Sequence, residues 1–199
     1  MRSNVCKIEN GTKDLNAILR ECEKVAAYNE LTHKQSLQLR LIWEEIDGML
    51  PNIIDNFNGD LWIEFENGVC KVHISLHFDE FTAKKKSELV AIEKNKKNAS
   101  AVGIVGKIRS ALENVFLDEE NFGVSTLSVE TRYLLGEYCD PLDYSSLWSL
   151  ESYRTTVSKE EKSEDWDELE KAVIASVADD IVVGGMGKNA DIIIVKKFA

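Results

Sequence analysis

The stretch LQLRLIWEEIDGML, residues 37–50, decides how the rest of the chain is interpreted. Its apolar side chains recur every three or four residues, which predicts an amphipathic α-helix with one buried face. On a helical wheel of about 100° per residue, the side chains that cluster around one direction are Leu39, Ile42, Ile46, Met49 and Leu50. Glu44 falls on the opposite, solvent-facing side, whereas Glu45 falls inside the apolar arc, near its edge.

A carboxylate such as that of Glu45, at the edge of a hydrophobic core, costs free energy unless it is paired or hydrated. In one interpretation, Glu45 forms an ion pair with a lysine or arginine, or reaches water at the rim of the core. In the other, it faces a cleft and acts as a general base that orients water or a metal-bound phosphate. The wheel alone favours the first interpretation and leaves the second open.

The same periodicity predicts three further helices, over about residues 14–28, 104–115 and 166–178. The central helix is predicted to begin at Thr32, because Thr32-x-x-Gln35 is a capping-box pattern. It is predicted to end near Leu50, because Pro51 lacks the backbone N–H that a continuing helix uses.

Two β-hairpins are also predicted. The first joins strands over residues 61–65 and 70–78 through Asn67-Gly68, a dipeptide typical of tight hairpin turns. The second lies in IVVGGMGKNADIIIVKKF, residues 181–198. The GGMGK within it lacks the spacing of a phosphate-binding loop, so it is interpreted as a hairpin turn.

These elements predict an α+β fold in a single domain, residues 1–199. The expected architecture is a two-layer α/β sandwich, with helices on one face of a mostly antiparallel, mixed sheet. Residues 117–164 combine aromatic residues with turn signals, and we expect strands or short helices there. They are interpreted as an insertion in the domain.

The composition predicts a protein of the reducing cytoplasm. The net charge is −11 and the pI about 4.8, which disfavours binding to nucleic acid or anionic lipid. The four cysteines stand singly, and the sequence has neither a signal-peptide pattern nor an apolar run that would span a membrane. The segment Lys84–Lys97 is the basic exception, interpreted as a solvated loop, with contact to nucleic acid as the alternative.

Residues 39–50 resemble the N-box helix of the histidine-kinase-like ATPase fold, the group that includes sensor kinases, gyrase and anti-sigma serine kinases. The anti-sigma branch is the most similar. It typically has an arginine and an apolar stretch, then a glutamate, and an asparagine four residues later. Aligned on Arg40 and Leu41, the family glutamate falls on Glu45. The resemblance covers residues 30–116 and 165–198.

The resemblance implies a site for ATP or ADP with magnesium, in which Glu45 is the general base. The carboxylate that reads adenine would come from Asp79 or Glu80, at the end of the second strand of the first hairpin.

By the same resemblance, the lysine-rich segment 82–100 takes the place of a lid over the nucleotide. Gly103, Gly106 and Lys107 would receive phosphate at the start of a helix. The alternative is that the two glycines only allow tight packing.

Three departures from the family pattern bear on function. Met49 stands where the asparagine would hold magnesium, and a thioether does not bind that hard cation. The sequence DEFTA, residues 79–83, replaces the Asp-x-Gly-x-Gly box, and the turn AVGIVGK is shorter than the family form. We therefore expect that the fold was kept and the ATPase chemistry lost or altered.

The sequence thus predicts a cytoplasmic regulatory protein that binds another protein, as anti-sigma factors do, with weak or no nucleotide turnover. Its acidic surface suits a basic partner. The alternative is a functional ATP-binding protein or serine kinase with Glu45 as the base. Nucleic-acid binding through Lys84–Lys97 ranks third.

Overall fold

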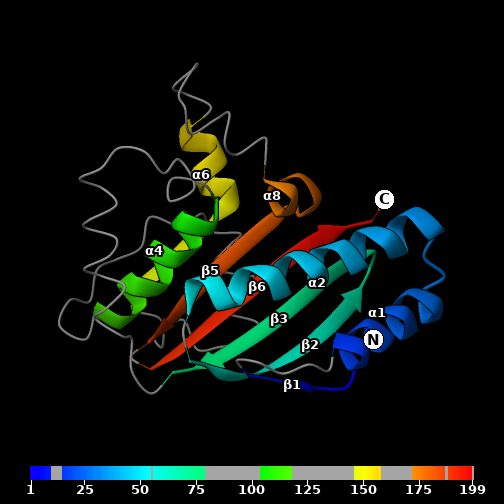
Figure 1. Ribbon diagram of the computed structural model, residues 1–199. Coiled ribbons are helices and arrows are strands. Elements are labelled where there is room, and N and C mark those ends of the chain that lie inside the picture. The colour runs from blue at the N-terminus through cyan, green and yellow to red at the C-terminus, as the bar shows by residue number, and fades with distance from the viewer. Residues whose placement is uncertain are drawn as a thin grey trace.

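The computed structural model describes residues 1–9, 15–54, 56–78, 104–117, 146–157, 172–186 and 188–198. Its strands form one six-stranded sheet in the order β1-β2-β3-β6-β5-β4 (Figure 1). The strands are β1 (Cys6–Glu9), β2 (Asn58–Glu66), β3 (Val69–His77), β4 (Ser146–Ser149), β5 (Asp180–Met186) and β6 (Asn189–Lys197). The helices are α1 (Leu15–Tyr28), α2 (His33–Ile53), α4 (Ile104–Leu117), α6 (Leu150–Val157) and α8 (Val173–Val177).

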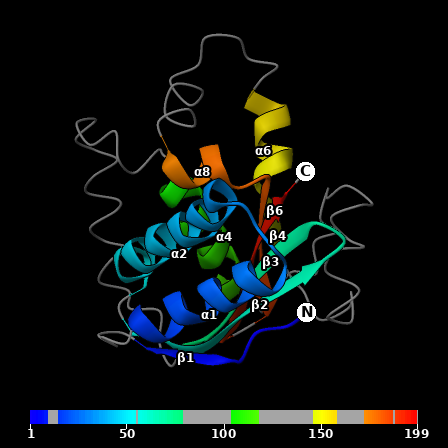
Figure 2. The ribbon, with the colours of Figure 1, turned by 90° about the vertical axis from the view of Figure 1, so that its right-hand side faces the viewer.

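The helices α1, α2 and α4 lie on the same face of the sheet (Figure 2), which confirms the α+β sandwich. The expectation of a mixed sheet is wrong for the described strands, because every neighbouring pair is antiparallel. The connections explain this. Strands β2 and β3 form one hairpin and β5 and β6 another, and the two hairpins join along β3 and β6, which also run in opposite directions.

The first hairpin forms as its sequence predicts. Asn67 and Gly68 occupy the turn with φ angles of 50° and 78°, the positive values that a two-residue turn of this hand requires. Alternate residues of β2 and β3 point to the helices, and buried partners such as Ile63 and Val72 face each other across the pair. Strand β1, which the sequence did not predict, is only four residues long and covers the outer edge of β2.

Helix α2 lies across the sheet and begins with the predicted capping box. The Thr32 hydroxyl accepts a hydrogen bond from the Gln35 N–H, and the Thr32 N–H donates to the Gln35 side chain at 2.8 Å. The predicted end near Leu50 is wrong, because the helix continues through Pro51 to Ile53. Leu50 and Ile53 are both buried, and this burial outweighs the one hydrogen bond that the proline removes.

The face of the sheet turned away from α2 is also buried at its centre. His73 pairs with Ile193, which pairs with Val182, and each of the three is at most 5% exposed. Strands β5 and β6 are therefore apolar on both faces, which explains their continuous runs of valine and isoleucine. The sequence analysis predicted helices on one face of the sheet and did not predict this second apolar layer.

Part of the predicted insertion, residues 146–157, is built into the sheet and the core. Strand β4 forms the edge next to β5, and the following helix α6 buries Leu150 and Val157. The Ser149 hydroxyl accepts from the Ser152 N–H at 3.1 Å, and the buried Asp180 carboxylate accepts from the Glu151 N–H at 2.9 Å. These two bonds satisfy N–H groups of the first turn of α6.

Arg154 of α6 fastens the end of α8. Its guanidinium donates to the backbone carbonyls of Ala175, Ala178 and Asp179, the last at 2.8 Å. These carbonyls lie at the C-terminal end of α8, where a cation is favourable. Of the helix predicted over residues 166–178, residues 172–178 are described, and they are helical over Val173–Val177. No helix in the described part of the chain is long and apolar enough to cross a membrane.

Two glycines give a matched test of this packing. A Cβ on Gly59 would lie 2.2 Å from the backbone oxygen of Ser75, whereas a Cβ on Gly48, in the exposed part of α2, meets nothing within 4 Å. We expect Gly59→Ala to lower the free energy of unfolding by about 1–3 kcal/mol through overpacking. Gly48→Ala should raise it by about 1 kcal/mol, because alanine favours the helix. Thermal or urea unfolding of both variants measures this, and a neutral Gly59→Ala would contradict the close approach of β2 and β3.

Candidate functional site

The two adjacent glutamates of α2 have different surroundings, as the wheel predicts. Glu44 is exposed and forms an ion pair with Arg40, with Nε and Oε1 2.8 Å apart. Glu45 is half-buried and forms neither a hydrogen bond nor an ion pair within the described residues. The rim ion pair considered for Glu45 is therefore not formed in this part of the structure, and its carboxylate remains available to a ligand or to water.

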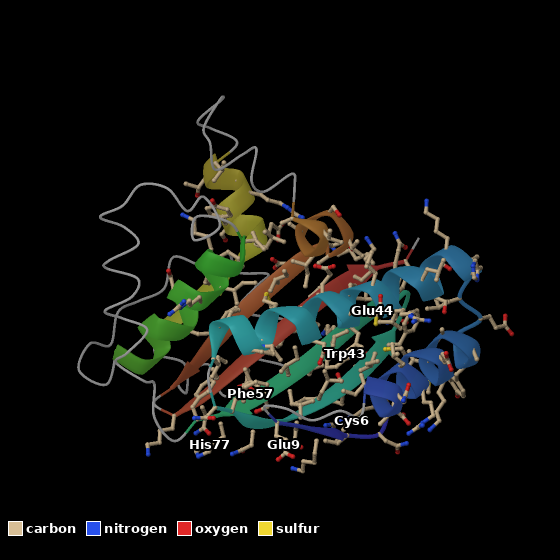
Figure 3. The ribbon with its side chains drawn as sticks, viewed as in Figure 1. Cys6, Glu9, Trp43, Glu44, Phe57 and His77 are labelled. Atoms are coloured by element: carbon tan, nitrogen blue, oxygen red, sulfur yellow. The ribbon has the colours of Figure 1, made fainter. Side chains whose placement is uncertain are left out.

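The flank of α2 that carries Glu45 follows from the position of Trp43. Trp43 lies on the side of α2 next to α1 and β2 (Figure 3). Residues two apart in a helix lie about 160° apart around its axis, so Glu45 points to the opposite flank. On that flank α2 contacts α4 and α8. Glu45 thus lies at the edge of the core, on the side where α4 passes.

Helix α4 supplies the second part of the candidate site. Ile104, Ile108 and Leu112 are buried, which confirms the predicted apolar stripe. Gly106 is half-buried in the first turn. The Lys107 ammonium lies 5.1 Å from the centre of the Tyr153 ring of α6, within the range of a cation–π contact.

Glu45 and Lys107 therefore lie on two helices that touch, yet no ion pair joins them in the described structure. Lys107 contacts α6, a partner that the sequence did not predict. Tyr153 in turn packs on Trp148 of β4, with ring centres 6.1 Å apart. The Lys107 ammonium therefore lies against the Tyr153 ring, which is itself held by Trp148.

Met49 is buried, only 5% exposed, and belongs to the same core as Ile42 and Ile46. The position at which the resembled family would hold magnesium is therefore an apolar contact in this chain. Within the described residues, no group of three histidine, cysteine, aspartate or glutamate side chains is placed to hold a metal ion.

The other predicted site residues lie outside the described ranges. These are Asp79, Glu80, Gly103 and the segment Lys84–Lys97. The described residues that follow β3 end just before them, at the buried Phe78, whose N–H donates to the Lys188 carbonyl at 3.0 Å.

A polar cluster around the buried His73, on the opposite face of the sheet, was not predicted. The His73 ring stacks on Trp62, with centres 4.8 Å apart and planes within 3°, and the Arg2 guanidinium lies 4.8 Å from the centre of the Trp62 ring. The Glu64 carboxylate accepts from the Trp62 Nε1–H at 3.1 Å and lies 3.5 Å from His73 Nε2. The cluster forms because β2 and β3 place Trp62 opposite His73, a register that sequence alternation alone does not fix.

His77 lies four residues further along β3, and its Nδ1 lies 2.9 Å from the side-chain oxygen of Asn189. A hollow of about 540 Å³ lies beside the His73 cluster, lined by residues that include Arg2, Glu64 and Lys71. Because it opens on the face opposite α2, it is not part of the Glu45 site.

The chain was compared with protein families, curated proteins and solved structures. No protein family, no curated protein and no solved structure matches the chain. The function is therefore argued from the residues and their geometry.

Burial of His73 gives a prediction about stability and pH. Burial lowers the pKa of His73 to about 4, against the opposing effect of Glu64 and with smaller contributions from Lys71 and Arg2. Between pH 6.5 and 4 the unfolded chain binds this proton and the folded chain does not, so stability falls as pH falls. We expect a loss on the order of 2 kcal/mol between pH 7 and 5 from this histidine.

His73→Phe, which keeps a ring against Trp62, should remove this part of the pH dependence in unfolding measured at both pH values. His33→Gln serves as the control, because His33 is exposed at the start of α2. An unchanged pH dependence in His73→Phe would contradict the burial of a neutral imidazole.

Proposed function

We propose that the chain is a regulatory protein of the histidine-kinase-like ATPase fold that acts by binding another protein, with weak or absent nucleotide turnover. The observation that carries this proposal is the burial of Met49. Magnesium-dependent phosphoryl chemistry requires oxygen ligands that hold the metal against the phosphates. In the proposed alignment, the residue at that position packs in the core instead.

The contact of Lys107 supports the same proposal. A lysine that binds phosphate must direct its ammonium to the anion, whereas here the ammonium rests on Tyr153. The contact is worth about 0.5–1 kcal/mol at a partly exposed site, so it weakens phosphate binding rather than preventing it. The net charge of −11 favours a partner with a basic surface, because opposite charge speeds and orients association.

One observation favours an alternative. Glu45 keeps a half-buried carboxylate without a cationic partner in the described structure, as a general base facing a nucleotide would. In this alternative the chain is a functional ATP-binding protein or serine kinase, and other residues supply the magnesium ligands.

Thermal melting with nucleotide separates the two functions. We expect the melting temperature to be the same with ATP or ADP alone and with magnesium added, because Met49 supplies no ligand for the metal. A ligand present at 100 times its Kd adds about 2.7 kcal/mol of stability, so a functional magnesium–nucleotide site would raise the melting temperature by several degrees. Such a magnesium-dependent rise overturns the proposal and supports the alternative.

The matched pair Glu45→Gln and Glu44→Gln tests the role of the two glutamates. If the chain is a regulator, both variants should bind the purified partner as tightly as the wild type. If it is an enzyme, Glu45→Gln should abolish ATP turnover and keep nucleotide affinity, because only the base is lost. Glu44→Gln should keep turnover, because it removes only the exposed ion pair with Arg40.

A further inference from the structure

Cysteines from distant parts of the sequence lie on α1 and on the face of the sheet that α1 covers. Cys6 lies on β1 opposite Leu61, so its side chain is on the helix-facing side of the sheet. Cys22 lies in α1. Cys70, the second residue of β3, is on the same face of the sheet as Cys6, but four positions along β3 from Ile74, the residue in register with Leu61. Cys6 is half-buried, whereas Cys22 and Cys70 are at most 4% exposed. One thiol of the three is thus open to small reagents.

Hydrogen bonds fix the first strand to α1 beside these thiols. The Asn4 backbone N–H donates to the Glu21 carboxylate at 3.1 Å, and the Asn4 side-chain amide donates to both its oxygens at 3.2 and 3.3 Å. Glu21 is itself buried and also accepts from the Lys24 ammonium at 2.6 Å. These bonds hold a residue two positions before Cys6 against the residue that directly precedes Cys22. Figure 3 shows Cys6 on β1, under α1.

We propose that Cys6 and Cys22 form a site of reversible oxidation, in which a peroxide links the two thiols as a disulfide between β1 and α1. The Cys6 thiolate breaks the O–O bond of hydrogen peroxide, keeps one oxygen as a sulfenic acid and releases the other as water. The Cys22 thiolate then attacks the Cys6 sulfur. The S–O bond breaks, the S–S bond forms and a second water leaves with the proton of Cys22. The two thiols lose two electrons, which the peroxide takes up.

The difference in exposure between Cys6 and Cys22 decides which thiol reacts with the peroxide and which then attacks the oxidised sulfur. Cys6 is the thiol that the peroxide reaches, because the other two are buried. Burial, with a smaller contribution from the charge of Cys6, raises the pKa of Cys22 to about 12. Oxidation of Cys6 to the neutral sulfenic acid removes the second of these effects and makes Cys22 a better nucleophile. The high pKa of Cys22 makes the second step faster as pH rises above neutral.

Cys70 is the natural internal control. Its pKa is also raised to about 12 by burial, with a smaller contribution from Cys22, and its side chain has no access to solvent. It belongs to β3, two strands from β1, and is separated from Cys6 by β2. We therefore expect the link to join Cys6 to Cys22 and not to Cys70.

Peptide mapping of peroxide-treated protein tests the proposal. The full chain carrying Cys139→Ser is exposed to dilute hydrogen peroxide, alkylated and cut with trypsin. Cleavage after lysine and arginine places Cys6 in SNVCK, residues 3–7, and Cys22 in ECEK, residues 21–24. We expect a linked pair of these two peptides that dithiothreitol separates, formed faster at higher pH. The linked protein should also melt at a higher temperature, because the disulfide restricts the unfolded chain.

Variants complete the test. Cys6→Ser should abolish the linked pair, and Cys70→Ser should leave it intact. Accumulation of the sulfinic or sulfonic acid on Cys6 with Cys22 still alkylated overturns the proposal, as does a link to Cys70. The mapping uses the unaltered Cys6 and Cys22, so its result stands even if one of the serine variants folds poorly. The outcome is independent of whether the chain binds nucleotide.

Discussion

The packing of α2 against the sheet is the contact on which the rest of the structure depends. Leu39, Ile42 and Ile46 are fully buried, and they lie on the side of the helix that packs in the core. Each such side chain contributes about 1.5–3 kcal/mol when removed from water. A helix held so firmly has a fixed rotation about its axis. That rotation places Met49 in the core, Glu44 in solvent and Glu45 at the edge between them, so the positions available for chemistry follow from packing.

Structural features that depend on a few neighbouring residues could be predicted from the sequence. The capping box of Thr32, the turn at Asn67 and the apolar stripe of α4 each depend on neighbours in the chain, and all three are present in the structure. The assignment of Glu44 to solvent and Glu45 to the edge of the core also needed only helical periodicity. This local part of the candidate site therefore follows from the order of the residues alone.

The rest depends on which segments meet, and no local pattern encodes that. The pairing of His73 with Ile193 brings together strands that are far apart in the sequence and contributes to a second apolar layer on the sheet. Strand β1 is too short to show an alternation, and its place at the edge follows from pairing with β2. Likewise, the contact of Lys107 with Tyr153 joins α4, which the sequence predicts as a helix, to α6, which lies in a segment that the sequence does not assign to one element.

The contact between Lys107 and Tyr153 joins a residue that the family resemblance assigns to phosphate binding to a segment that it leaves unmatched. Tyr153 belongs to residues 117–164, for which that family has no counterpart in the proposed alignment, and Arg154 fastens its helix to α8. Helix α6 thus supplies the ring on which the candidate phosphate-binding lysine rests. An ammonium–phosphate bond is charge-assisted and stronger than a cation–π contact, so the ring alone does not abolish binding. Met49 and Lys107, two residues that the resemblance places at the nucleotide site, thus both make packing contacts within this chain.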